Sequence, residues 1–253
     1  MAKMTNNLPE LAIVAAAYLI AGTLKGALGL GFSTTCLPIL VLGLGHRESL
    51  PLVIIPSVFS NLLVMRATPA LVETAREYWL LYAVVIPGVV LGLWALHVAG
   101  TTLPTIILGA VLIAYAGFGL VRPDIRIKAA TARRAMVPVG FVNGVVNGLT
   151  GSQVMPVVPF LLAAEPDQNR FIQAVNAVFT LSSIVMFFGL SQAGLVTGRA
   201  LAISVVGIAV VHVGVAAGTR VRALLSDAMF RRSILLVLAA LGISLIIQVV
   251  FAE

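Results

Sequence analysis

The sequence predicts an all-α polytopic membrane protein made of two inverted repeats with about five helical segments each. The first observation is composition: 60% of the 253 residues are hydrophobic and 10% are charged, with a mean hydropathy of +1.10, whereas about 25% of a soluble domain is charged. The second is length, because several apolar runs reach about twenty residues, enough to cross a bilayer core of about 30 Å. The third is a pair of glycine-rich stretches that interrupt apolar runs at matching places in the two halves.

Ten apolar segments are expected. Those of about twenty residues span the membrane core, whereas those of about thirteen reach only about 20 Å and flank the glycine-rich stretches. We expect these short segments to be arms of helical hairpins whose tips meet near the membrane midplane. The segments are 8–27, 32–45, 49–65, 78–98 and 103–121, then 136–148, 153–164, 171–190, 199–218 and 232–251. The chain thus divides into a first transmembrane repeat (1–121), a basic cytoplasmic linker (122–135) and a second transmembrane repeat (136–253).

Glycines at equivalent places support the internal repeat. Pairs of small residues four positions apart let membrane helices approach closely, and each half carries such pairs in its first and fourth segments. The matching positions are Gly22 and Gly26 with Gly140 and Gly144, and Gly88 and Gly92 with Gly214 and Gly218.

Positive charges lie in loops, and their distribution predicts the orientation of the halves. The linker Arg122 to Arg134 and the loop Arg220 to Arg232 are basic, so both are expected in the cytoplasm. The first-half equivalent of the latter loop, Ala99 to Thr102, is uncharged and is expected on the opposite side. The repeats are therefore inverted, with five crossings per half, or three and a re-entrant hairpin. Further expectations are Arg66, Arg76 and Arg170 in the cytoplasm, and Lys3, Arg47, Arg199 and both chain ends in the periplasm.

The two interruptions read AGTLKGALGLGFSTTCLP (21–38) and GFVNGVVNGLTGSQVMP (140–156). Interior glycines lower helix propensity and proline removes a backbone donor. In lipid, non-helical backbone is tolerated only where protein buries it or where it lines a polar cavity. Two broken segments at matching positions are therefore a pointer to the binding site of a transporter.

The polar groups at the interruptions are hydrogen-bond donors or neutral, and all nine carboxylates lie at segment ends or in loops. Lys25 adds a positive charge that costs about 2.5–3.5 kcal/mol at the membrane centre, and helix N-termini would add free N–H groups. This set suits a small anion and not a metal, and we expect no cofactor. The predicted substrate-binding residues are Lys25, Gly29, Gly31, Ser33, Thr34, Asn61, Asn147, Thr150, Gly151, Ser152, Gln153 and Asn176.

Each of these residues has a plainer interpretation. Lys25 could extend to the interface, and the glycines could serve helix packing alone. The hydroxyl and glutamine side chains could bond locally to freed carbonyls, and Asn61 and Asn176 could join helices without touching a substrate. His212 could be a proton site, although a packing histidine is the commoner case.

No phosphate loop, HExxH or GxSxG motif is present, and nothing in the sequence brings Ser152 and His212 within the reach that a protease dyad needs. We therefore expect no enzymatic activity. The net charge of +7 lies in loops between apolar segments, which argues for membrane topology and against nucleic-acid binding.

Over essentially its whole length the chain resembles the sulfite exporter (TauE/SafE-type) permease family. The resemblance rests on the two glycine-rich stretches, the equal halves and the basic linker. The family usually shows Gly-x-Gly-Gly-Gly in each half, whereas this chain has Gly29-Leu30-Gly31-Phe32-Ser33 and Gly148-Leu149-Thr150-Gly151-Ser152. The replaced positions would line the site, so the expected fold carries over more directly than the expected substrate.

The resemblance implies export or uptake of sulfite or organosulfonate anions across the inner (plasma) membrane of a bacterium. From the inverted halves and their midplane hairpins we expect a secondary transporter that works by alternating access. Its partners would be the small anion, membrane lipid and, as a possibility, a second copy in a homodimer. Two alternatives remain at this point: an anion channel of the same fold, and a membrane scaffold subunit that transports nothing.

Overall fold

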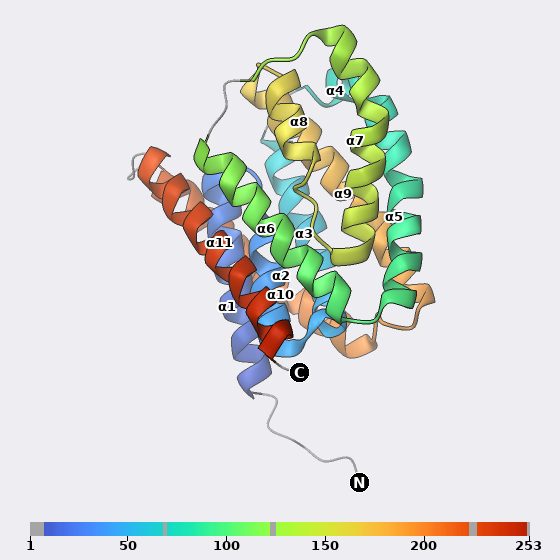
Figure 1. The fold of residues 1–253 in the computed structure, drawn as a ribbon. Helices are drawn as coiled ribbons and strands as arrows, with labels where there is room; N and C mark the ends of the chain where they lie inside the picture. The colour runs from blue at the N-terminus through green and yellow to red at the C-terminus, as the bar shows by residue number, and fades with distance from the viewer. Residues whose placement is uncertain (1–7, 68–69, 122–124, 223–226, 252–253) are drawn as a thin grey trace.

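The structure, a computed structural model, describes residues 8–67, 70–121, 125–222 and 227–251, which form eleven α-helices (Figure 1). Ten of them correspond one to one to the ten expected segments. The helices are α1 (Leu8–Leu28), α2 (Phe32–Leu44), α3 (His46–Arg66), α4 (Leu71–Glu77), α5 (Trp79–Ala99), α6 (Thr102–Val121), α7 (Ala129–Thr150), α8 (Val157–Ala164), α9 (Gln168–Gln192), α10 (Gly198–Arg222) and α11 (Asp227–Phe251).

Six helices of the described residues are long and apolar enough to cross a membrane: α1, α3, α5, α6, α9 and α10. The short helices α2 and α8 have 13 and 8 residues, so neither crosses a core of about 30 Å. The chain is a multi-pass membrane protein. Its outer surface agrees with this, because side chains such as Val206 (74% exposed), Phe188 (62%) and Phe251 (81%) would face lipid.

The helix breaks lie where the sequence predicts them. Helix α1 ends at Leu28 because Gly29 and Gly31 adopt left-handed backbone conformations, with φ of 76° and 95°. Helix α7 ends at Thr150, where Gly151 has φ of 81°, and residues 152–156 precede α8. Only glycine adopts such φ values without strain, so these positions fix where each hairpin turns.

The start of α7 and the presence of α4 differ from expectation. Helix α7 begins at Ala129, inside the stretch assigned to the linker, and residues 122–124 of that linker lie outside the described part. Helix α4 was not expected, because its seven residues include Glu73, Arg76 and Glu77 and make no long apolar run. It lies at the end of the bundle where α3 stops and α5 starts (Figure 1).

Helices of the two halves pack in reciprocal pairs. Helix α1 packs on α10 and α5 packs on α7, while α3 packs on α9 and α6 on α11. Glycines make the first two contacts close. A Cβ atom added at Gly26 would overlap the carbonyl oxygen of Val215, and one added at Gly148 would overlap that of Val89. The small-residue pairs noted in the sequence are thus backbone-to-backbone contacts.

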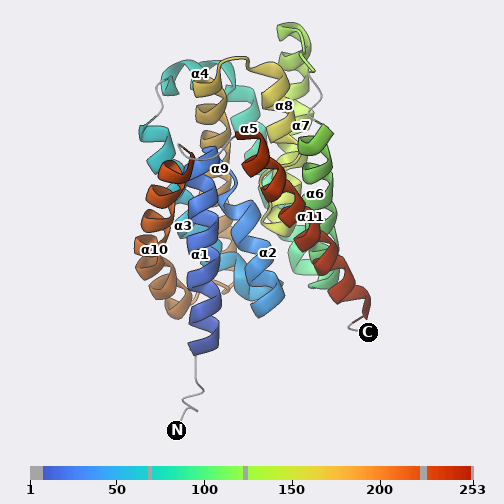
Figure 2. The same cartoon turned by 90° about the vertical axis from the view of Figure 1, so that its left-hand side faces the viewer.

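The two ends of the bundle are defined by the course of the chain (Figures 1 and 2). The first described residues of α1 and the last of α11 lie at one end, here called the terminal end. The last residues of α6 and the first of α7 lie toward the other, the linker end. At the linker end Arg170 pairs with Glu77. At the terminal end Arg199 pairs with Glu10 at 2.7 Å.

Candidate functional site

The two helix breaks meet inside the bundle. Ser33, in the first turn of α2, lies with its hydroxyl 3.4 Å from Gln153 Oε1 in the second break. The Ser33 hydroxyl is also 2.9 Å from that of Ser57 on α3. Gln153 Nε2 donates to Ser183 Oγ on α9 at 2.8 Å. These four buried residues, here called the serine–glutamine cluster, connect both breaks to the helix pair α3 and α9.

A small cavity lies beside this cluster. Its volume of about 10 Å³ is close to what one water molecule needs. Its lining includes Asn147, whose Nδ2 is buried and has no hydrogen-bond partner among the described residues. The polar lining residues are Ser33, Ser57, Asn147, Gln153 and Ser183, and the apolar ones are Leu37, Leu50, Val53, Ile54 and Met186, together with Gly151.

Lys25 forms a second polar cluster with two asparagines. It is fully buried, and its Nζ donates to Asn61 Oδ1 on α3 at 2.7 Å and to Asn176 Oδ1 on α9. Asn176 Nδ2 in turn donates to the carbonyl of Gly29 in the first break at 3.0 Å. Lys25 therefore points into the bundle and not to the interface. The two asparagines do join helices, as the plainer interpretation expected, and they do so through the lysine amine.

Among the described residues, Lys25 has no side chain of opposite charge beside it. No carboxylate within the described ranges forms an ion pair with Lys25. Of the carboxylates whose burial is described, Glu165 is the buried one, and it is paired with Arg170 at the linker end. A buried cation is costly unless an anion or hydrogen bonds compensate it, and at Lys25 the compensation comes from neutral amides.

The helical period places both clusters on the same two helix faces. Ser57 and Asn61 are one turn apart on α3, and Asn176 and Ser183 are two turns apart on α9. Because α3 and α9 pack against each other, their polar faces form one stripe. The Lys25 and serine–glutamine clusters lie along it, next to the two breaks.

The remaining predicted residues shape the helix breaks or lie close to them. Thr150 Oγ1 donates to the carbonyl of Val146 at 2.7 Å, the local bond that the plainer interpretation expected. Ser152 Oγ is buried without a partner in the described part of the chain. Thr34 is buried in α2 and does not line the cavity. Gly29 and Gly31 shape the first break, and Gly151 does so for the second.

Sequence reasoning missed several residues of the site. Ser57, Ser183 and Met186 line the cavity, and the first two could have been found from their helical spacing to Asn61 and Asn176. Asn143 Nδ2 donates at 2.9 Å to the carbonyls of both Gln153 and Met155 and so holds the second break. His212 lies away from the site, with its ring 6.3 Å from that of Phe59, which agrees with a packing histidine.

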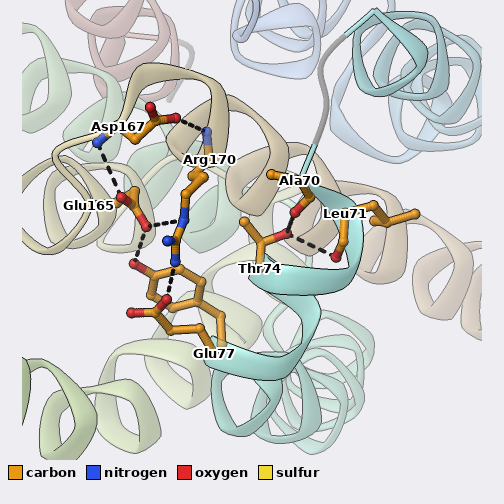
Figure 3. A network of polar contacts seen from close by, with 8 residues as sticks. Ala70, Leu71, Thr74, Glu77, Glu165, Asp167 and Arg170 are labelled. Carbon is orange, nitrogen blue, oxygen red and sulfur yellow. Dashed lines mark hydrogen bonds and ion pairs between the residues drawn. The ribbon is translucent and has the colours of Figure 1, made fainter.

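At the linker end, a polar network joins the two halves (Figure 3). Arg170 on α9 pairs with Glu77 at the end of α4, and its Nε lies 3.1 Å from Glu165 Oε2. The hydroxyl of Tyr78 donates to the same Glu165 oxygen at 3.2 Å. Burial, with the nearby Glu165 and Glu77 carboxylates, raises the pKa of Tyr78, so the phenol keeps its proton and remains a donor. Glu165 Oε1 accepts from the backbone N–H of Asp167.

At the terminal end, a vestibule of about 570 Å³ is lined by Arg47, Glu48 and Arg199 among other residues. Helix α3 separates it from the central cavity. Pro51 and Leu52 face the vestibule, whereas Leu50, Val53 and Ile54 face the cavity.

Comparison with known proteins gives one match. The model of the family described as sulfite exporter TauE/SafE matches residues 14–245. No curated protein and no solved structure matches the chain. The family is one of membrane transporters and not of enzymes, and the match covers nearly all of the described helices, including both breaks. The chain belongs to the sulfite exporter TauE/SafE family.

Proposed function

We propose that this protein is a secondary transporter of small sulfur-containing anions, sulfite or organosulfonates, and that it works by alternating access. The observation that carries the proposal is Lys25: a fully buried cation, without a carboxylate partner in the described residues, held next to the place where two broken helices meet. An anion that enters this region would supply the opposite charge that the protein leaves out.

Unpaired donors support an anionic ligand. Asn61 Nδ2, Asn147 Nδ2 and Ser152 Oγ are all buried without a hydrogen-bond partner in the part of the chain that is described. Leaving a buried donor unsatisfied costs about 1–3 kcal/mol, and the oxygens of a sulfite or sulfonate group would recover that free energy. Ser33 lies in the first turn of α2, so the N-terminal end of that helix adds free N–H groups beside the cavity.

We propose further that the halves 1–121 and 136–253 are inverted repeats joined by the linker 122–135. The pairing of helices between the halves supports this, because α1 and α7 open the two halves and each packs on the fourth expected segment of the other half, α10 and α5 respectively. So does the course of the chain, which starts the first half at the terminal end and the second at the linker end (Figure 1). Such halves can rock about a central site and expose it alternately.

Orientation follows from the basic residues. Arg76 and Arg170 lie on elements of the linker end, and Arg47 lines the terminal-end vestibule. We propose that the linker end is cytoplasmic and that the vestibule opens to the periplasm of a bacterial inner membrane. The chain carries no nucleotide-binding motif, so an ion gradient or the gradient of the anion itself drives transport. A homodimer stays a prediction, which native mass spectrometry would test.

Transport by the purified protein in liposomes tests the proposal. We expect saturable uptake of radiolabelled sulfite or methanesulfonate, accelerated by unlabelled anion on the opposite side. Lys25→Met should reduce uptake at least about tenfold, since it removes the charge that faces the ligand. Lys128→Met makes the same change at an exposed residue before α7 and should retain uptake.

Each contrary result excludes a part of the proposal. Flux that does not saturate and shows no counterflow would indicate a channel. No flux of any sulfur oxyanion, with a correctly folded protein, would contradict transport itself. Equal uptake by Lys25→Met and the wild type would remove Lys25 from the site.

A further inference from the structure

Within the described residues of the two central clusters, Lys25 is the one ionisable side chain. Besides Lys25, the buried polar side chains of both clusters are serines, asparagines and a glutamine, all of them neutral. The charged residues on the helices packed around Lys25 lie in first or last turns within the described part of the chain. They are Glu10 on α1, Arg47, Glu48 and Arg66 on α3, Arg170 on α9, and Arg199, Arg220 and Arg222 on α10, while α2 has none.

We propose that the central site selects anions with a single negative charge, such as hydrogensulfite or a sulfonate with a small uncharged tail, over anions with two. The inference rests on the proposed transport function and adds the charge class of the substrate. One negative charge neutralises a protonated Lys25. A second leaves a buried negative charge that only neutral amides and hydroxyls could compensate, and such a charge is strongly disfavoured in a low-dielectric interior.

The shape of the cavity leads to the same substrate class. Its polar lining, with Ser33, Asn147 and Gln153, could bind one oxyanion group. The rest of its lining consists of apolar side chains such as Leu50 and Met186. An uncharged organic tail can pack there as the cavity widens. The carboxylate of sulfoacetate, its second anionic group, would then lie against these apolar side chains without a hydrogen-bond donor.

Asn61 offers an isosteric test of the charge argument. Its Oδ1 already accepts from Lys25 Nζ at 2.7 Å, so Asn61→Asp would add a carboxylate at that position with almost no change of shape. The interior would then be neutral before any ligand enters. Asn169→Asp, which makes the same change at an exposed residue in the first turn of α9, is the matched control.

Binding is measured by thermal shift of the purified full-length protein, since a ligand that binds the native state raises the apparent stability. Methanesulfonate and ethanesulfonate are compared with sulfate, thiosulfate and sulfoacetate at one pH and equal ionic strength. For the wild type we expect the monoanions to bind at least about tenfold more tightly than the dianions. Asn61→Asp should lose monoanion binding by at least about tenfold without a lower melting temperature in the absence of ligand. Asn169→Asp should bind monoanions as the wild type does.

Three results would overturn the inference. Dianions that stabilise the wild type as strongly as methanesulfonate would contradict the charge rule while leaving anion transport intact. Unchanged methanesulfonate binding in folded Asn61→Asp would show that the Lys25 charge does not select the ligand. A wild type that binds no anion of either class, and moves none in liposomes, would contradict the transport function together with the rule.

Discussion

The hydroxyl of Tyr18 on α1 donates a hydrogen bond of 2.6 Å to the carbonyl oxygen of Leu52 on α3. Within a regular helix that carbonyl would accept from the N–H of residue 56, but Pro56 has none. The free acceptor is thus satisfied by another helix. Ser204 on α10 approaches the same oxygen at 3.4 Å. The part of α3 that separates vestibule and cavity is therefore held in place from both halves.

Tyr18→Phe should destabilise the protein by about 1–2 kcal/mol, because the buried carbonyl of Leu52 loses its short hydrogen bond. The melting temperature in detergent checks this. Ser204→Ala removes only the longer contact, and its effect should be smaller. A larger loss of melting temperature in Ser204→Ala than in Tyr18→Phe would show that the Tyr18 hydrogen bond is not the more important of the two.

Gly26→Ala and Gly148→Ala should each destabilise by about 1–3 kcal/mol or more, since the added methyl group would overlap a carbonyl oxygen of the neighbouring helix. Gly117 on α6 has open space around it. Gly117→Ala should therefore be neutral or stabilise by up to about 1 kcal/mol through helix propensity. Melting temperatures of the three variants give the comparison, and equal effects would refute tight packing at the first two sites.

Gln153→Ala should reduce anion transport at least about tenfold, because this side chain joins Ser33 of one half to Ser183 of the other. Liposome uptake measures the effect. Gln192, exposed at the end of α9, provides the matched Gln192→Ala control. Full activity of Gln153→Ala would place the anion elsewhere.

Arg170→Gln should loosen the linker end, because it removes the cation that Glu77 and Glu165 share. The single cysteine of the chain, Cys36, is buried in α2 beside cavity-lining Leu37 and can report on this. We expect slow labelling of wild-type Cys36 by a maleimide and labelling several-fold faster in the variant. Arg199→Gln removes an ion pair at the opposite end of the bundle and is the control. General destabilisation would accelerate Cys36 labelling in both variants, whereas a local opening would accelerate it only in Arg170→Gln.

The sequence predicts the helices well, because the thickness of the membrane sets the length of an apolar helix and the glycines set where α1 and α7 end. Ten apolar runs became ten helices, and Gly29 and Gly151 end α1 and α7 within about two residues of the expected places. Helix α4 is not predicted, because it has only seven residues, three of them charged, and so makes no long apolar run.

The site was harder to predict than the fold. The sequence indicates which polar residues lie in apolar helices, but both the lipid-facing and the buried faces of such helices are apolar, so periodicity alone does not orient them. Lys25, Asn61 and Asn176 were each named, yet nothing in the sequence shows that the two amides would meet at the amine. Ser57 and Ser183 look like ordinary small residues of a membrane span until α3 and α9 are placed together.

The glycine-lined pairs α1 with α10 and α5 with α7 have a consequence for biogenesis. During synthesis, α1 and α5 insert into the bilayer before their partner helices are made. Until then, the glycine-lined faces of these helices contact lipid. A stable bundle forms only after α7 and α10 arrive. Separate expression of either half should yield a protease-sensitive product, and co-expression of the two should restore the whole.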